Sequence, residues 1–195
     1  MALLFALVLA APAWSQNVVE PKSGVAFAPK SGDMSLLGVG LRTKTFLKVK
    51  VYAVGLYVAD SALQDSLAAH KGALGTPAFF KDLVAGDFEK ELVLKFVRGV
   101  TTDQIQGAFR EALTGADQSR VKTFLSFFGD TKPGDEYRLH WLPGGILETT
   151  VAAQPHPQIQ DKPFTSAVFG IWLGDKPVQD DIKTGLVARA GDFIK

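Results

Sequence analysis

Arg42 and Tyr52 are the two residues whose types and spacing best suit the binding of an anion. Both lie in one apolar, strand-forming run, residues 37–58, LGVGLRTKTFLKVKVYAVGLYV. An arginine keeps its charge in a protein and offers a rigid fork of donors, so a partly buried arginine needs an anionic partner or several acceptors. A tyrosine hydroxyl can donate to the same oxygen while its ring lines an apolar tunnel. We expect the pair to bind a ligand carboxylate or phenolate.

Each residue also has an ordinary structural explanation. Arg42 could pair with a protein carboxylate such as Glu20 or Asp33, or lie on the surface after a turn. Tyr52 could be a sheet tyrosine whose hydroxyl reaches solvent.

A long strand should position Tyr52. Aromatic and β-branched residues recur over residues 46–59, and Gly38 and Gly40 predict a tight turn before Arg42. Strict alternation would place Lys48 and Lys50 on the same face as Tyr52, provided that no bulge intervenes.

Other catalytic patterns are weak. His70, His140 and His156 lack the spacing of metal ligands. The sequence has no nucleophile elbow, phosphate-binding loop or dinucleotide fingerprint. We therefore expect no metal site and no cofactor.

Composition narrows the class of protein. The chain has 195 residues, of which 47% are hydrophobic, which is enough for one sizeable core and one domain. A formal net charge of +1 excludes the basic field that nucleic acids require. With no cysteine, the fold must rest on its core without disulfides.

The N-terminus has the pattern of a secretion signal. An uncharged apolar run, residues 2–11, precedes small residues that suit a cleavage site. We expect a signal peptide at 1–15, a mature domain at 16–195, and export to a periplasm or beyond. A membrane anchor is the alternative, but roughly ten apolar residues fall short of the ~20 that span a bilayer. No stable membrane insertion is expected after processing.

The remaining pattern indicates an α+β fold. Strands are predicted at 46–59, 91–98, 136–142 and 146–152, the last two joined by a Pro-Gly-Gly turn. Helices are predicted at 60–74, 77–84, 101–113, 118–128, 164–173 and 178–190, and Thr101 and Gln104 form a capping box. We expect an antiparallel sheet with a layer of helices on one face and an apolar cleft between them.

Three short motifs carry a family resemblance. They are GVGLR at Gly38–Arg42, AVGLY at Ala53–Tyr57, and SAVFGIWLGDKPV at Ser166–Val178. Their order and intervals resemble chalcone isomerases and their non-catalytic, fatty-acid-binding relatives. The resemblance implies the open-faced β-sandwich of that family, with Arg42 and Tyr52 facing its ligand pocket.

Several positions resemble the binding branch more than the enzymes. The enzymes have threonine where this chain has Tyr52, and a tyrosine and an asparagine at the positions of Ile105 and Ala112. A later pocket threonine corresponds to Ile171, which Trp172 follows. Apolar side chains at these positions suit an alkyl chain better than a polyphenol.

The resemblance therefore implies a non-catalytic protein that binds a fatty acid or a similar small hydrophobic carboxylate. Two alternatives stay open. The chain could be an intramolecular lyase that closes a phenol onto an enone, with Arg42 stabilising the oxyanion. It could instead be an envelope interaction protein with a vestigial pocket filled by Phe and Trp side chains.

Overall fold

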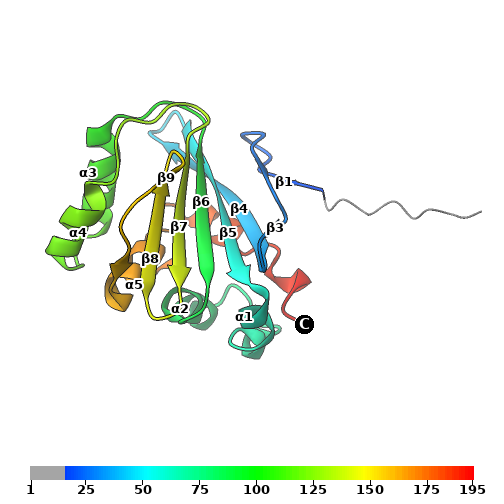
Figure 1. Ribbon diagram of the computed structural model, residues 1–195. Helices are drawn as coiled ribbons and strands as arrows, with labels where there is room; N and C mark the ends of the chain where they lie inside the picture. Colours follow the sequence, from blue (N-terminus) through cyan, green and yellow to red (C-terminus); the bar gives the residue numbers. More distant parts are fainter. Residues whose placement is uncertain (1–15) are drawn as a thin grey trace, which may run out of the picture.

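A single curved, antiparallel sheet organises the computed structural model, which describes residues 16–195 (Figure 1). Its strand order is β10-β8-β7-β6-β5-β4-β3, with β9 paired to β8. The strands are β3 (Lys30–Ser31), β4 (Met34–Lys44), β5 (Val49–Ala59), β6 (Lys90–Phe96), β7 (Glu136–Leu142), β8 (Ile146–Val151), β9 (Gln154–Pro155) and β10 (Ile159–Gln160). A separate ribbon is formed by β1 (Val18–Val19) and β2 (Ala26–Phe27).

Short helices pack against this sheet. They are α1 (Asp60–Gln64), η1 (Ala68–His70), α2 (Pro77–Ala85), α3 (Thr102–Ala112), α4 (Gln118–Leu125), α5 (Lys162–Leu173), α6 (Asp180–Gly185) and η2 (Ala190–Asp192). In Figure 1, α2 and α5 lie behind the sheet, and α3 packs with α4 beside them. The predicted α+β fold with helices on one face is confirmed.

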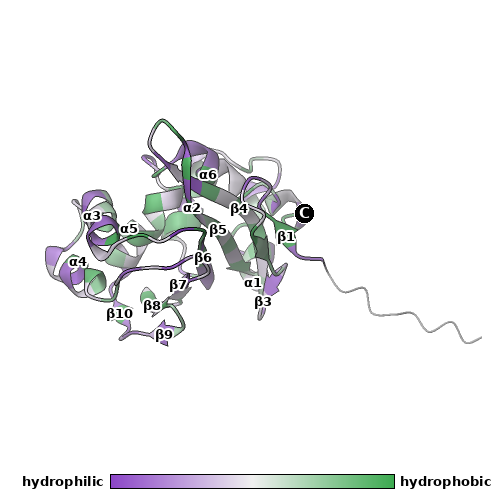
Figure 2. Cartoon of the chain, turned by 90° about the horizontal axis from the view of Figure 1, so that it is seen from above, coloured by the Kyte–Doolittle hydropathy of each residue, from purple (hydrophilic) through white to green (hydrophobic). Residues whose placement is uncertain are grey.

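The two faces of the sheet differ in polarity. The helix-covered face carries buried apolar side chains such as Leu56, Leu92 and Trp141, and Figure 2 shows such residues gathered where strands and helices meet. The opposite face carries charged pairs such as Arg138 with Glu91 at 3.0 Å. Buried and partly exposed residues alternate in β7 and β8, so the opposite face is wet there, whereas β4, β5 and β6 are buried on both faces over most of their length.

Local sequence signals set several element ends correctly. The Thr101 hydroxyl oxygen accepts a hydrogen bond from the backbone N–H of Gln104, and Oε1 of Gln104 accepts one from the backbone N–H of Thr101, so the predicted capping box is present. The predicted hairpin joins β7 to β8. The predicted helix at 60–74 instead stops at Gln64 and resumes only as the short η1, and no side chain caps its start. The last predicted helix is likewise divided into α6 and η2.

The predicted turn at Gly38 and Gly40 is wrong, because both glycines lie inside β4. Their role is close packing under α6. A Cβ atom on Gly38 would lie 2.1 Å from the carbonyl oxygen of Gly185, and one on Gly40 would lie 3.1 Å from Cα of Ile182. The glycines therefore let a helix approach the strand backbone. The tight turn comes later, at residues 45–48, and β5 begins at Val49 rather than at Phe46.

A β-bulge overturns the predicted faces of the lysines. Arg42 pairs with Tyr52, but the next residue, Thr43, pairs with Lys50, so Val51 is an extra residue in β5. Such an insertion shifts the alternation of the strand by one position. Val51 and Tyr52 consequently line the same cleft, whereas Lys50, with Lys48 beside it, lines a groove on the other side.

Lys90 is the most unusual residue of the core, because its side chain is 0% exposed. Its Nζ donates to the carbonyl oxygen of Gly86 at 2.6 Å, at the end of α2, and lies 3.7 Å from the ring centroid of Trp141. Burial lowers the pKa of the Lys90 ammonium to about 7, with Asp87 opposing the shift.

The predicted signal peptide, residues 1–15, lies outside the described residues. Within residues 16–195, no helix has the length and apolar character needed to cross a bilayer.

Candidate functional site

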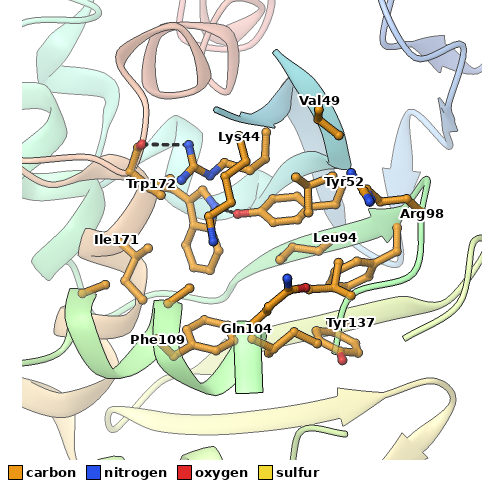
Figure 3. Close-up of a pocket in the computed structure, with 18 of the residues that line it drawn as sticks. Lys44, Val49, Tyr52, Leu94, Arg98, Gln104, Phe109, Tyr137, Ile171 and Trp172 are labelled. Carbon is orange, nitrogen blue, oxygen red and sulfur yellow. Dashed lines mark hydrogen bonds between the residues drawn. The ribbon is translucent and has the colours of Figure 1, made fainter. Parts of the chain in front are cut away.

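A cleft of about 240 Å³ opens between α3, α5 and the adjoining ends of β4, β5 and β6 (Figure 3). All six residues singled out in the sequence line it: Arg42, Tyr52, Ile105, Ala112, Ile171 and Trp172. They come from four different elements, so the fold brings together residues that are far apart in the chain.

Arg42 enters the cleft from the end of β4 with its charge uncompensated. Its Nη1 donates to the carbonyl oxygens of Thr43 at 3.0 Å and Val178 at 3.2 Å, and to Oε1 of Gln179 at 3.2 Å. These acceptors are all neutral, and no carboxylate of residues 16–195 lies within 4.0 Å of the guanidinium. The three bonds fix the side chain, while the hydrogens of Nε and Nη2 have no acceptor in the described part of the chain.

The predicted alternative partners of Arg42 are engaged elsewhere or too distant. Glu20 accepts hydrogen bonds from the backbone N–H groups of Lys22 and Ser23, within its own turn. Asp33 forms no salt bridge with Arg42. The explanation of Arg42 as half of an internal ion pair with either carboxylate is therefore wrong.

Tyr52 is oriented by Trp172. The indole Nε1 donates to the Tyr52 hydroxyl oxygen at 3.1 Å, a bond drawn in Figure 3. Because the indole can only donate, the tyrosine keeps its own hydrogen for another acceptor, and the described residues supply none. Burial raises the pKa of Tyr52 to about 12, although the Trp172 bond and the Arg42 charge favour the ionised form. Tyr52 is thus a neutral hydrogen-bond donor at neutral pH.

The floor of the cleft is apolar and aromatic. Phe109 packs edge-on against Trp172, with centroids 6.3 Å apart, and Phe96 packs against Tyr52 at 5.5 Å. Ile105 and Ile171 complete this surface from α3 and α5. The rings form the walls and leave the cleft open, contrary to a vestigial pocket filled by Phe and Trp side chains.

Several residues that line the cleft were not predicted from the sequence. Lys44 and Arg98 are exposed cations at the rim, and Figure 3 shows Lys44 reaching across the cleft past Trp172. The sequence shows that both residues follow strand-forming runs. It does not show that the ends of these two strands adjoin the same cleft in the fold. Phe109 belongs to the apolar stripe of α3 and could have been found from that periodicity.

The cleft continues into a second, more open groove between α3 and α5. This groove has a volume of about 770 Å³ and shares Arg42, Lys44, Ala112 and Ile171 with the cleft. Small side chains in α3 and α5, including Gly107 and Gly170, keep it wide. A molecule longer than the cleft could extend along it.

The histidines do not form a metal site. Nε2 of His140 lies 3.0 Å from Glu89 and Nδ1 lies 3.3 Å from Glu148, an arrangement of ion pairs on the wet face of the sheet. His70 contacts Asp82, and His156 stacks on Phe127. Throughout residues 16–195, no three His, Cys, Asp or Glu side chains are grouped so that they could hold a metal ion.

Comparisons with known proteins agree with this geometry. A sequence profile of the family described as Chalcone isomerase-like matches residues 22–188. Fatty-acid-binding protein 1 of Arabidopsis thaliana is 27% identical over 91% of this chain and 72% of its own length. Chalcone isomerase-like protein 1 of Humulus lupulus is 29% identical over 80% of this chain and 82% of its own.

Enzymes are also among the relatives. A chalcone–flavanone isomerase of Zea mays is 29% identical over 93% of this chain and 89% of its own. Among solved structures, a fatty-acid-binding protein of Arabidopsis thaliana superposes with a TM-score of 0.78 at 20% identity, covering 92% of this chain and 99% of the other. That likeness establishes the fold.

Proposed function

The chain belongs to the chalcone isomerase-like family, and from that premise we propose that it binds a fatty acid or similar hydrophobic carboxylate without catalysing a reaction. The observation that carries this proposal is Arg42, a fixed cation with only neutral acceptors, at the edge of an apolar cleft.

The head group of the ligand would lie between Arg42 and Tyr52. A carboxylate there would accept from Nη2 or Nε of Arg42 and from the Tyr52 hydroxyl, because the two residues are paired across β4 and β5 and line the same cleft. Charge-assisted bonds of this kind are the strong ones, since the donor is ionised.

The alkyl chain would lie against the aromatic floor and extend into the groove between α3 and α5. Ile105, Ala112 and Ile171 contribute no side-chain hydrogen bond on this path. The hydroxyl of Tyr137, which also lines the cleft, donates to the carbonyl oxygen of Gly129 at 3.4 Å. The aromatic and aliphatic floor suits methylene groups, whereas the groove beyond it also carries charged side chains such as Asp103 and Glu111.

Titration of delipidated protein with a saturated C16 fatty acid tests this proposal. We expect Arg42→Ala to weaken binding by about 10- to 100-fold, the value of a charge-assisted hydrogen bond. Arg110→Ala is the matched control, since Arg110 is an exposed arginine of α3 that does not line the cleft.

The methyl ester of the same acid separates the head group from the chain. It should bind the wild type weakly and lose nothing further in Arg42→Ala, because the ester has no charge for Arg42 to meet. If the two ligands bind the wild type equally, or if Arg42→Ala and Arg110→Ala bind the acid alike, the proposed head-group site is wrong.

The intramolecular lyase is the second candidate, supported by the enzyme relatives and by Arg42, which could stabilise a phenolate. Loss of chalcone absorbance measures this activity. We expect only the spontaneous rate, because the side chains of Ile105, Ala112 and Ile171 cannot position a phenol or a carbonyl by hydrogen bonding. A rate clearly above the spontaneous one that Arg42→Ala abolishes would make the protein an isomerase.

We also propose export, with residues 1–15 as a signal peptide. The support is the apolar run and the small residues that follow it. Intact-mass measurement of the protein from its native host should give a chain that begins near Gln16. A full-length chain that retains Met1 would refute export by this route.

A further inference from the structure

The turn that joins β4 to β5 projects two large apolar side chains into solvent. Phe46 is 91% exposed and Leu47 is 70% exposed, the highest values among the large hydrophobic residues of 16–195, ahead of Val19 at 51%. Single exposed apolar residues are common, but two adjacent ones at a projecting tip form a surface that water solvates poorly.

The turn holds this tip in a defined shape. The backbone N–H of Lys48 donates to the carbonyl oxygen of Thr45 at 3.0 Å, which closes the loop around Phe46 and Leu47. Thr45 and Lys48 have φ values of 67° and 51°, in the left-handed region that residues other than glycine seldom adopt. A conformation of this kind persists where the surrounding structure or a function maintains it.

Positive charge surrounds the tip. Lys44, Lys48 and Lys50 lie beside it in the hairpin, and Lys22 lies across the adjoining groove. Two aspartates, Asp180 and Asp181, also line that groove, and Lys22 lies 3.8 Å from Asp181. Four lysines against two aspartates leave the region cationic. Lys44, Lys48 and Lys50 are also close in the sequence, and the fold adds Lys22 to them.

The tip is continuous with the mouth of the cleft. Lys44, Thr45 and Val49 line the cleft and also belong to the hairpin or directly follow it. A planar surface that contacts Phe46 and Leu47 would therefore also lie against the entrance of the ligand site.

We propose that the hairpin tip, residues 44–50, docks onto an anionic lipid bilayer. Phe46 and Leu47 enter the boundary between head groups and acyl chains, where apolar side chains are favoured. The lysines lie at the level of the lipid phosphates and keep their charges in water. This contact is peripheral, differs from membrane insertion of a helix, and does not depend on which ligand the cleft binds.

A tryptophan placed in the tip tests the contact where it is made. Phe46→Trp should show a blue-shifted emission with vesicles of phosphatidylcholine and phosphatidylglycerol, and quenching when the lipids carry bromine on their acyl chains. The same measurement on the parent chain subtracts the signal of the native tryptophans. Vesicles of phosphatidylcholine alone should give a much smaller response, because they lack the anionic head groups.

Charge variants made in the same full chain test the lysines. Lys48→Gln/Lys50→Gln should lower the affinity for anionic vesicles by about fivefold per lysine, and salt should lower that of the wild type. The matched control is Lys71→Gln/Lys81→Gln, which removes two exposed lysines near η1 and in α2, at the far end of the sheet (Figure 1).

The outcomes are separable. If the chain binds vesicles while the emission of Phe46→Trp stays unchanged, another part makes the contact and the proposal is wrong. Equal losses in the two lysine pairs would indicate a diffuse charge effect and would also overturn it. Phe46→Ser/Leu47→Ser could keep the vesicle affinity of the wild type and lose the ability of the wild type to bind a second protein. That result would make the tip a protein interface instead.

Discussion

Two cationic side chains lie under the same layer of helices, and the protein accommodates them in opposite ways. Lys90 is completely buried near the end of α2, with a carbonyl oxygen and the face of Trp141 as its contacts. Arg42 is partly exposed at the cleft, also with neutral acceptors only. A lysine in a dry site can release its proton, and burial brings the Lys90 pKa to about 7. An arginine cannot do so.

The difference explains how each region serves the molecule. The residue that can become neutral is buried among apolar side chains, and it donates a hydrogen bond to a carbonyl oxygen at the end of α2. The residue that stays charged lies where an anion can enter. The region around Lys90 is therefore a structural core, and the region around Arg42 is suited to a charged ligand.

The largest effect should come from truncating Lys90. Lys90→Ala removes a fully buried side chain and its bond to the Gly86 carbonyl oxygen, so it should lower the free energy of unfolding by about 3 kcal/mol or more. Arg42→Ala should lower it by about 1 kcal/mol or less, because the site is open to water and its bonds are to neutral groups. Urea unfolding of both variants measures the contrast. A larger loss from Arg42→Ala would show that Arg42 is structural.

A smaller effect should follow from changing Tyr52. Tyr52→Phe leaves the buried Nε1 of Trp172 without its acceptor, which should cost about 1–2 kcal/mol of unfolding free energy. Adding Trp172→Phe to Tyr52→Phe removes the unsatisfied donor, so the two losses should not add. Strict additivity in this double-mutant cycle would mean that the indole bond does not orient Tyr52.

The smallest effect should be a pH dependence near neutrality. Between the folded pKa of about 7 and the unfolded value of 10.5, the unfolded chain binds one more proton than the folded chain, so stability rises with pH. From pH 7 to pH 8 the gain should be about 1 kcal/mol. Above pH 10 the raised pKa values of Tyr52 and Tyr57, both about 12, act in the opposite direction.

Lys90→Met isolates this dependence, since it keeps the volume of the side chain and has no proton to release. Thermal unfolding of wild type and variant at both pH values should show the rise only in the wild type. An identical rise in Lys90→Met would assign it to other groups.

Much of this architecture could be predicted because its signals are local. The capping box at Thr101 and the hairpin at residues 143–145 depend on neighbouring residues only. Arg42 and Tyr52 were found because a charged and a phenolic residue are unusual in an apolar strand.

The errors arise where distant segments meet. Gly38 looked like a turn residue because the reason for it, the close approach of α6, lies far along the chain. The faces of Lys48 and Lys50 were inverted by the bulge at Val51, which strict alternation does not reveal. Lys44 and Arg98 meet at one rim only because the ends of β4 and β6 adjoin the same cleft.

The bond from Trp172 to Tyr52 sets what kinds of molecule the cleft can distinguish. The side chains of Arg42, Lys44 and Arg98 can only donate hydrogen bonds. Because Tyr52 already accepts a bond from the indole, its hydroxyl is also available as a donor. The strand side of the cleft therefore presents hydrogen-bond donors to a ligand. Among amphiphiles with tails of equal length, the proposed site should therefore prefer an oxyanion, which offers several acceptors, to a protonated long-chain amine or a quaternary ammonium, which offers none.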